Sequence, residues 1–150
     1  MLPLLEELLV AGKDVRVRVT GRSMAPQVRE GDVVTLRRPA PGAVGAGDIL
    51  LFRAAHGQPM LHRVVGRRQE GDGGTRLLLK GDALPAADEP VDGSRVVAVA
   101  IRVEREAAGG VCRSIDLSGR RRRAWARLLA LASRRLPRLF RAVSTRLARP

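Results

Sequence analysis

The segment Val-Arg-Val-Arg-Val-Thr-Gly-Arg-Ser-Met-Ala-Pro, residues 15–26, decides the predicted fold. Its first half alternates valine with arginine or threonine, and this period of two is typical of a half-buried strand. Gly21 and Pro26 then bound a turn that contains Ser23. Because glycine and proline shape the backbone sharply, the segment predicts a strand that ends in a loop presenting the Ser23 hydroxyl.

Short apolar runs continue along the chain after this segment. Each is rich in Val, Ile, Leu or Thr and bounded by Gly, Pro or Asp, at residues 32–36, 48–53, 61–65, 76–80, 96–103 and 111–117. Connections rich in Gly, Pro and Asp are expected at residues 39–46, 70–74 and 83–92. Many short strands separated by turn signals predict a mainly β fold, in the form of a compact antiparallel domain over residues 13–117.

Both ends of the chain carry helical patterns. At residues 1–12 the leucines are spaced as on one helix face, with Glu6 and Glu7 opposite and Gly12 at the end, which predicts a short amphipathic helix. Residues 118–150 predict a basic amphipathic tail, with apolar side chains from Trp125 to Leu147 on one face and arginines on the other. Its apolar face could pack on the β-domain or lie on an anionic membrane surface.

The composition limits the classes of function. Of the net charge of +13, residues from Arg113 onward contribute all but two units, so the basic character belongs to the tail. With no Tyr, one Trp and two Phe, the chain lacks the aromatic platforms on which bases stack, so we do not expect nucleic-acid binding. The single cysteine, Cys112, excludes an intrachain disulfide and a cysteine-based zinc site.

Targeting signals are absent from the sequence pattern. Glu6 and Glu7 interrupt the N-terminal apolar run, and no apolar run approaches the roughly 20 residues of a transmembrane helix. The start also lacks the basic region and cleavage site of a secretory signal. We therefore expect a cytoplasmic protein, with peripheral contact to an anionic membrane through residues 120–150 as the one membrane association to consider.

Six short motifs in the sequence indicate its function. They are Gly-Arg-Ser-Met-Ala-Pro (21–26), Glu-Gly-Asp-Val-Val (30–34), Gly-Asp-Ile-Leu-Leu-Phe (47–52), Leu-His-Arg-Val-Val (61–65), Lys-Gly-Asp (80–82) and Val-Val-Ala-Val (96–99). In this order they resemble the motif set of the S24/S26 serine peptidases, which include type I signal peptidases and self-cleaving LexA-like repressors. The resemblance covers about residues 14–104 and implies a β-domain like that of LexA and the signal peptidases. No helix-turn-helix precedes it, which argues against a LexA-like repressor.

The resemblance also implies roles for individual residues. Ser23 would be the nucleophile, and His62 would be its base, at a position where bacterial signal peptidases have lysine. A histidine there is similar to the signal peptidases of archaea and of the endoplasmic reticulum. The third member would be Asp88, with Asp82 as the alternative, because either acid could orient the imidazole. Lys80 is interpreted as structural rather than as the base.

The same resemblance suggests how a substrate would be held. Gly21 replaces a hydroxyl that contributes to the oxyanion hole in some relatives, so backbone N–H groups, including that of Ser23, would hold the oxyanion. A cleft lined by Met24, Pro26 and the strand around Ile49 and Leu51 would select small side chains beside the cut bond. The expected activity is endoproteolysis of a leader or precursor peptide without metal or organic cofactor. The alternative is a non-catalytic relative that binds a peptide, its basic tail contacting an anionic surface.

Overall fold

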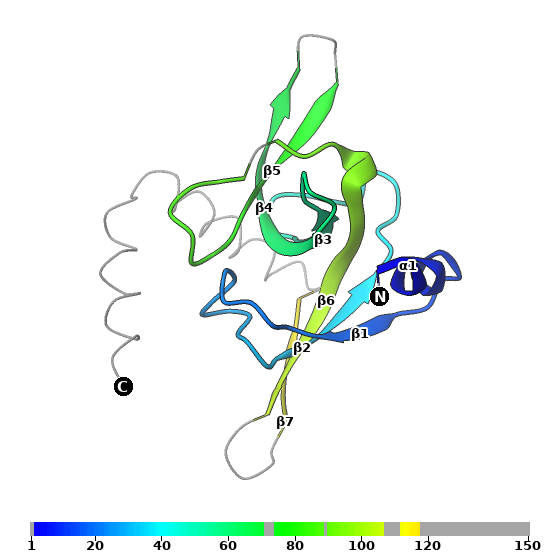
Figure 1. Cartoon of the computed structure of the whole chain (residues 1–150), viewed down its shortest axis with the longest axis vertical. Helices are drawn as coiled ribbons and strands as arrows, with labels where there is room; N and C mark the ends of the chain where they lie inside the picture. The colour runs from blue at the N-terminus through cyan, green and yellow to red at the C-terminus, as the bar shows by residue number, and fades with distance from the viewer. Residues whose placement is uncertain (1, 71–73, 89, 107–111, 118–150) are drawn as a thin grey trace.

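The computed structural model describes residues 2–70, 74–88, 90–106 and 112–117, and within them it forms a mainly antiparallel β structure (Figure 1). The elements in chain order are α1 (Leu2–Val10), β1 (Val15–Arg18), β2 (Val33–Arg37), β3 (Ile49–Arg53), β4 (Pro59–Gln69), β5 (Thr75–Lys80), the 3₁₀ helix η1 (Gly93–Arg95), β6 (Val96–Glu106) and β7 (Cys112–Asp116). Each apolar run predicted to be a strand is one, so the predicted mainly β fold is confirmed. The predicted tail helix over residues 118–150 lies outside the described residues.

One sheet contains every strand of the described residues, in the order β1-β2-β6-β3-β4-β5, with β7 paired to β6. The first half of β6 pairs with β3, and its second half pairs with β2 and β7. Register shifts at Thr35/Leu36, Leu51/Phe52 and Val64/Gly66 mark irregularities of the kind that bend strands and strengthen the sheet's twist. Figure 1 shows the result, a curved sheet from which the β4–β5 and β6–β7 hairpins project at opposite ends.

Two apolar clusters form the core, one on each face of β3. Ile49 and Leu51 belong to the larger cluster, which also contains the two buried leucines of α1, whereas Leu50 and Phe52 belong to the smaller one. The sequence of a strand that is buried on both faces is continuously apolar and does not alternate between apolar and polar residues. This explains why residues 49–52 show no polar alternation.

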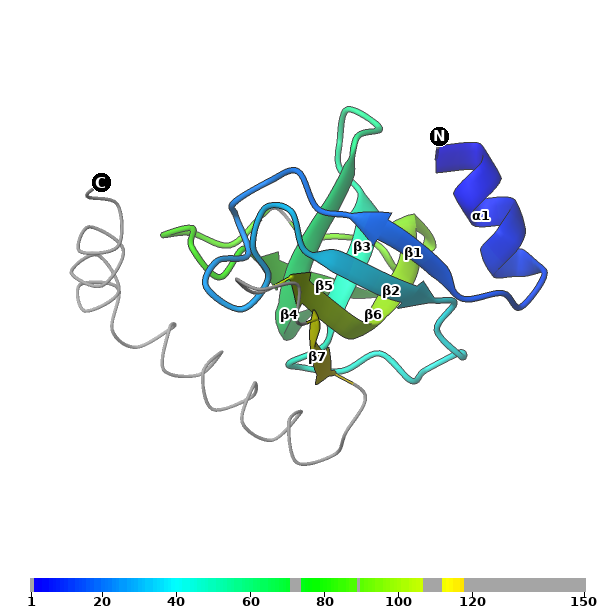
Figure 2. The ribbon, with the colours of Figure 1, turned by 90° about the horizontal axis from the view of Figure 1, so that it is seen from below.

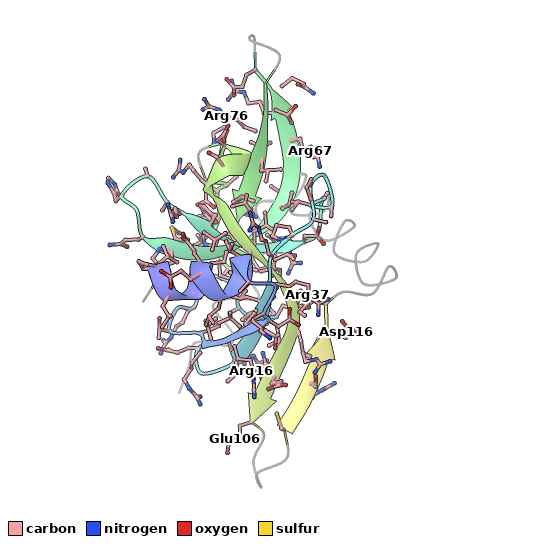
Figure 3. The ribbon with its side chains drawn as sticks, turned by 90° about the vertical axis from the view of Figure 1, so that its right-hand side faces the viewer. Arg16, Arg37, Arg67, Arg76, Glu106 and Asp116 are labelled. Carbon is pink, nitrogen blue, oxygen red and sulfur yellow. The ribbon has the colours of Figure 1, made fainter. Side chains whose placement is uncertain are left out.

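Strand β4 is longer than the predicted run at residues 61–65. Its outer part continues through Arg67, Arg68 and Gln69, which are exposed and paired with the start of β5. Backbone pairing extends this hairpin beyond the core, where no apolar alternation marks a strand in the sequence. The β4–β5 hairpin therefore projects from the body as a polar ribbon (Figure 3).

Helix α1 packs beside β1 at one side of the sheet (Figure 2). Leu5 and Leu9 are buried, and Glu6 forms an ion pair with Arg53 at the end of β3. Gly12 follows the helix with a φ of 76°, a left-handed conformation that favours glycine after a helix C-terminus. No helix within the described residues has the length and apolar character needed to cross a membrane.

A charged clamp joins the loop between β1 and β2 to strand β6. The Asp32 carboxylate is 3% exposed and accepts hydrogen bonds from the Arg29 backbone N–H and from the Arg105 guanidinium. Arg105 also donates to the backbone carbonyl of Gln27. Burial raises the pKa of the Asp32 carboxyl, but the bonds from Arg105 and Arg29 outweigh burial, so the pKa lies below its usual value.

We predict that Asp32→Asn lowers the free energy of unfolding by about 2–3 kcal/mol at pH 7, because a mostly buried ion pair loses one partner. The lowered pKa means that the carboxylate stabilises the fold fully above its unfolded pKa of about 3.9 and loses this effect as the pH falls toward its folded pKa. In denaturant titrations, the difference in the free energy of unfolding between the variant and the wild type should therefore become smaller from pH 7 to pH 3. Asp14→Asn, which breaks an exposed pair with Arg37, should cost under about 1 kcal/mol and serves as control. A constant gap across this pH range would contradict the assignment.

Candidate active site

Ser23 lies in the loop that connects β1 to β2. Its neighbour Met24 is 2% exposed, and Val28 is fully buried and donates its backbone N–H to the Met24 carbonyl. These two apolar anchors belong to the larger core cluster. They hold the loop against the sheet and leave the partly buried Ser23 at its surface, as the glycine and proline around it predicted.

His62 meets this serine from strand β4. Its ring is fully buried, and its Nε2 lies 3.1 Å from the Ser23 hydroxyl, although the two residues are 39 positions apart. The Phe52 ring packs near the imidazole, with centroids 5.8 Å apart. Burial and this aromatic neighbour restrict the ring to one orientation, with one nitrogen toward Ser23.

Asp88 meets the other nitrogen of the same ring. Its Oδ2 lies 2.5 Å from the His62 Nδ1, and its backbone N–H donates to the Leu79 carbonyl on β5. A carboxylate here accepts the Nδ1 proton and stabilises the tautomer in which Nε2 is the acceptor. The structure therefore brings Ser23, His62 and Asp88 into one hydrogen-bonded line.

Asp82 and Lys80, the other candidates in this region, do not contact the ring. The Asp82 carboxylate forms two hydrogen bonds with the Arg63 guanidinium, at 2.8 and 2.6 Å. Lys80 stands opposite Arg63 in the β4–β5 register, and the described residues show no bond between its side chain and Ser23. Of the two acids considered as orienting partners for His62, Asp88 holds that position.

Arg63 is a buried residue of the site that the sequence did not reveal. It is 3% exposed, and its guanidinium donates to the Gly47 carbonyl and the Gln27 side chain as well as to Asp82. It thereby links β4 to the loop after Ser23 and to the turn at Asp82. Arginine is rarely buried unless it is paired, so its residue type does not suggest burial. Its position next to His62 is the only signal in the sequence.

The turn at residues 81–84 holds the backbone of Ser23 directly. The Ala83 N–H donates to the Ser23 carbonyl at 2.8 Å. A Cβ at Gly81 would lie 2.8 Å from that same carbonyl oxygen and 2.9 Å from side-chain atoms of Leu84. The backbone of the turn approaches Ser23 closely only because residue 81 has no side chain.

We therefore predict that Gly81→Ala displaces Ser23 and lowers the free energy of unfolding by about 1–3 kcal/mol. Gly93→Ala is the matched control, because a Cβ there meets nothing within 4 Å. Denaturant titration measures the effect. Wild-type stability in Gly81→Ala would contradict the close approach.

A mostly apolar groove of about 310 Å³ opens beside Ser23 and His62. Met24 and Leu51 line it as expected, whereas Pro26 and Ile49 are not among its lining residues, and Ile49 is buried in the core instead. Three other contributors to its walls were not predicted from the sequence, namely Leu5 of α1, residues 17–21 and residues 59–61. For residues 17–21, the available signal in the sequence was the alternation of Val17 and Val19 with polar residues.

A comparison with known families gives the family of the chain. The sequence model described as "Peptidase S24-like" matches residues 1–79, just over half of the chain. The chain belongs to the peptidase S24-like family. The match includes Ser23 and His62 and ends before Asp82 and Asp88. No curated protein matches the chain.

The protein therefore carries a peptidase-type domain of this family. Among the described residues, no group of three or more His, Cys, Asp or Glu side chains is arranged to hold a metal ion. The side chains brought together at the site can carry out two steps, which are proton transfer at the His62 imidazole and nucleophilic attack by the Ser23 hydroxyl.

Proposed function

We propose that this S24-like protein is a serine endopeptidase of the signal-peptidase type that cleaves a leader or precursor peptide. The observation that carries the proposal is the line from the Ser23 hydroxyl through His62 to Asp88, with distances of 3.1 and 2.5 Å. A serine is a weak nucleophile without a base, and a triad is recognised by this geometry.

In the proposed reaction the groove holds the peptide with a small side chain beside the cut bond. His62 Nε2 takes the proton of Ser23 as its oxygen attacks the peptide carbonyl, and Asp88 stabilises the resulting imidazolium. The proton then passes to the leaving amine as the peptide C–N bond breaks, which leaves an acyl ester on Ser23. Water, deprotonated by His62, hydrolyses that ester and regenerates the hydroxyl.

The developing oxyanion would be held by backbone N–H groups, that of Ser23 among them. No hydrogen bond from this N–H is found within the described part of the chain. A cytoplasmic location and a membrane contact through residues 120–150 remain predictions, the latter because the tail lies outside the described residues.

A phosphonylating probe tests the proposal on the full-length protein. We expect a covalent adduct that mass spectrometry localises to Ser23, and no adduct in Ser23→Ala. Ser114→Ala on strand β7, where the serine is exposed, should label like wild type. If Ser23 stays inert in folded protein that still binds alanine-rich leader peptides, the protein is a peptide-binding relative and the proposal fails.

A further inference from the structure

A second hollow lies beside the C-terminal end of α1 and shares no lining residue with the catalytic groove. Its volume is about 730 Å³, within the range of binding sites for ligands. The walls come from the end of α1, the loop after β2, the β4–β5 hairpin and the start of β6. Nothing in the proposed peptidase reaction uses this surface.

The floor of this hollow is apolar and one wall is stiff. Leu9 and Leu77 are buried there beside half-buried valines of β6, and Val10 at the rim is 65% exposed. The loop wall contains Pro39 and Pro41, whose rings fix the backbone φ angle. A preformed surface of this kind loses little conformational entropy when a ligand binds.

Two arginines in the lining have no acidic partner among the residues that the structure describes. Arg38 is exposed and makes no hydrogen bond or ion pair within the described residues, and Arg67 donates only to the Val44 carbonyl there. Figure 3 shows Arg67 on the projecting hairpin. No aspartate or glutamate is found among the described residues that line the hollow, and Glu6 of the adjoining pocket, which Arg38 also lines, is paired with Arg53. The hollow therefore combines an apolar floor with two arginines that no acidic side chain pairs within the described part of the chain.

We propose that this hollow, formed around Arg38 and Arg67, docks an acidic, extended peptide segment of a partner protein. Apolar side chains of the segment lie on the floor, and its carboxylates pair with the two guanidinium groups, whose fork geometry suits carboxylates. The chain's own tail does not fit, because residues 118–150 contain eleven arginines and no acid. A single-stranded nucleic acid is not favoured either, since none of the described lining residues is aromatic and its bases would have nothing to stack on.

Fluorescence anisotropy on the full-length protein tests this docking site. The probe is a labelled ten-residue peptide that alternates glutamate with valine, compared with a lysine–valine and a glutamate–serine peptide. We expect the glutamate–valine peptide to bind best. Arg38→Glu and Arg67→Glu should each weaken its binding by about fivefold or more, because an attractive charge becomes repulsive. Arg68→Glu, an exposed neighbour on the same strand that does not line the hollow, should stay within about twofold of wild type.

Other outcomes overturn the proposal. An equal loss of peptide binding in Arg68→Glu, or equal binding of the glutamate–serine peptide, would mean general charge attraction. Tighter binding of duplex DNA than of the acidic peptide would favour a nucleic acid. Arg38→Glu removes no bond within the described residues, so its result is not explained by unfolding of the loop. Its cleavage of short leader peptides should equal that of wild type, which separates this site from the proposed peptidase function.

Discussion

Replacing His62 with alanine is expected to lower kcat/KM for cleavage of an alanine-rich leader peptide by about four to six orders of magnitude. The imidazole is fully buried, and its Nε2 is the acceptor found beside the Ser23 hydroxyl, at 3.1 Å. Without it, the hydroxyl keeps its proton and remains a weak nucleophile. Cleavage rates at substrate concentrations below KM measure the effect.

The control for this experiment is His56→Ala, which removes the other histidine of the chain, an exposed residue between β3 and β4. It should retain wild-type activity. His62→Gln, which leaves a smaller cavity beside Phe52, separates loss of the base from loss of packing. Ser23→Ala should be as inactive as His62→Ala, and the double variant no worse, because the two residues act as a unit. Substantial cleavage by folded His62→Ala would remove the imidazole from the mechanism.

The strands could be predicted because each has a local pattern. In β1, Val15 and Val17 are partly buried and alternate with exposed arginines, so a period of two marks the strand directly. The outer part of β4 could not be predicted in this way, since Arg67 to Gln69 bury nothing and are held by pairing with β5. Strand pairing between distant segments leaves no trace in the local alternation of either one.

The site residues depend on contacts between distant parts of the chain. Ser23 and His62 were predicted from ordered motifs, but their contact requires the loop between β1 and β2 to lie beside strand β4, which no local pattern states. Arg63 shows the limit most clearly. Burial of a guanidinium is tolerable only when it is paired, and its partner Asp82 lies 19 residues further along the chain. The sequence left Asp82 as an alternative to Asp88 because Asp82 ends the Lys-Gly-Asp motif and Asp88 follows it by six residues.

Asp88→Asn and Asp82→Asn should fail in different ways, and the contrast separates the two acids. Asparagine at position 88 presents an N–H₂ or a neutral oxygen to the His62 Nδ1 in place of the carboxylate 2.5 Å away. The tautomer with Nε2 as acceptor loses its support, so we expect kcat to fall by about four orders of magnitude with the fold intact. The measurement is single-turnover cleavage together with thermal unfolding of each variant.

Asparagine at position 82 instead deprives the buried Arg63 guanidinium of the Asp82 carboxylate charge. The free energy of unfolding should fall by about 2–4 kcal/mol, because the pair is largely removed from water. Activity should fall by less than about a hundredfold at temperatures where the variant is folded, since the effect on Ser23 passes through the Ala83 N–H to the Ser23 carbonyl. Removing both charges of the pair, in the double variant Asp82→Asn with Arg63→Met, should recover part of the stability because no unpaired charge remains buried. If Asp82→Asn instead matched Asp88→Asn in lost activity while remaining folded, Asp82 would be the residue that orients His62 during catalysis.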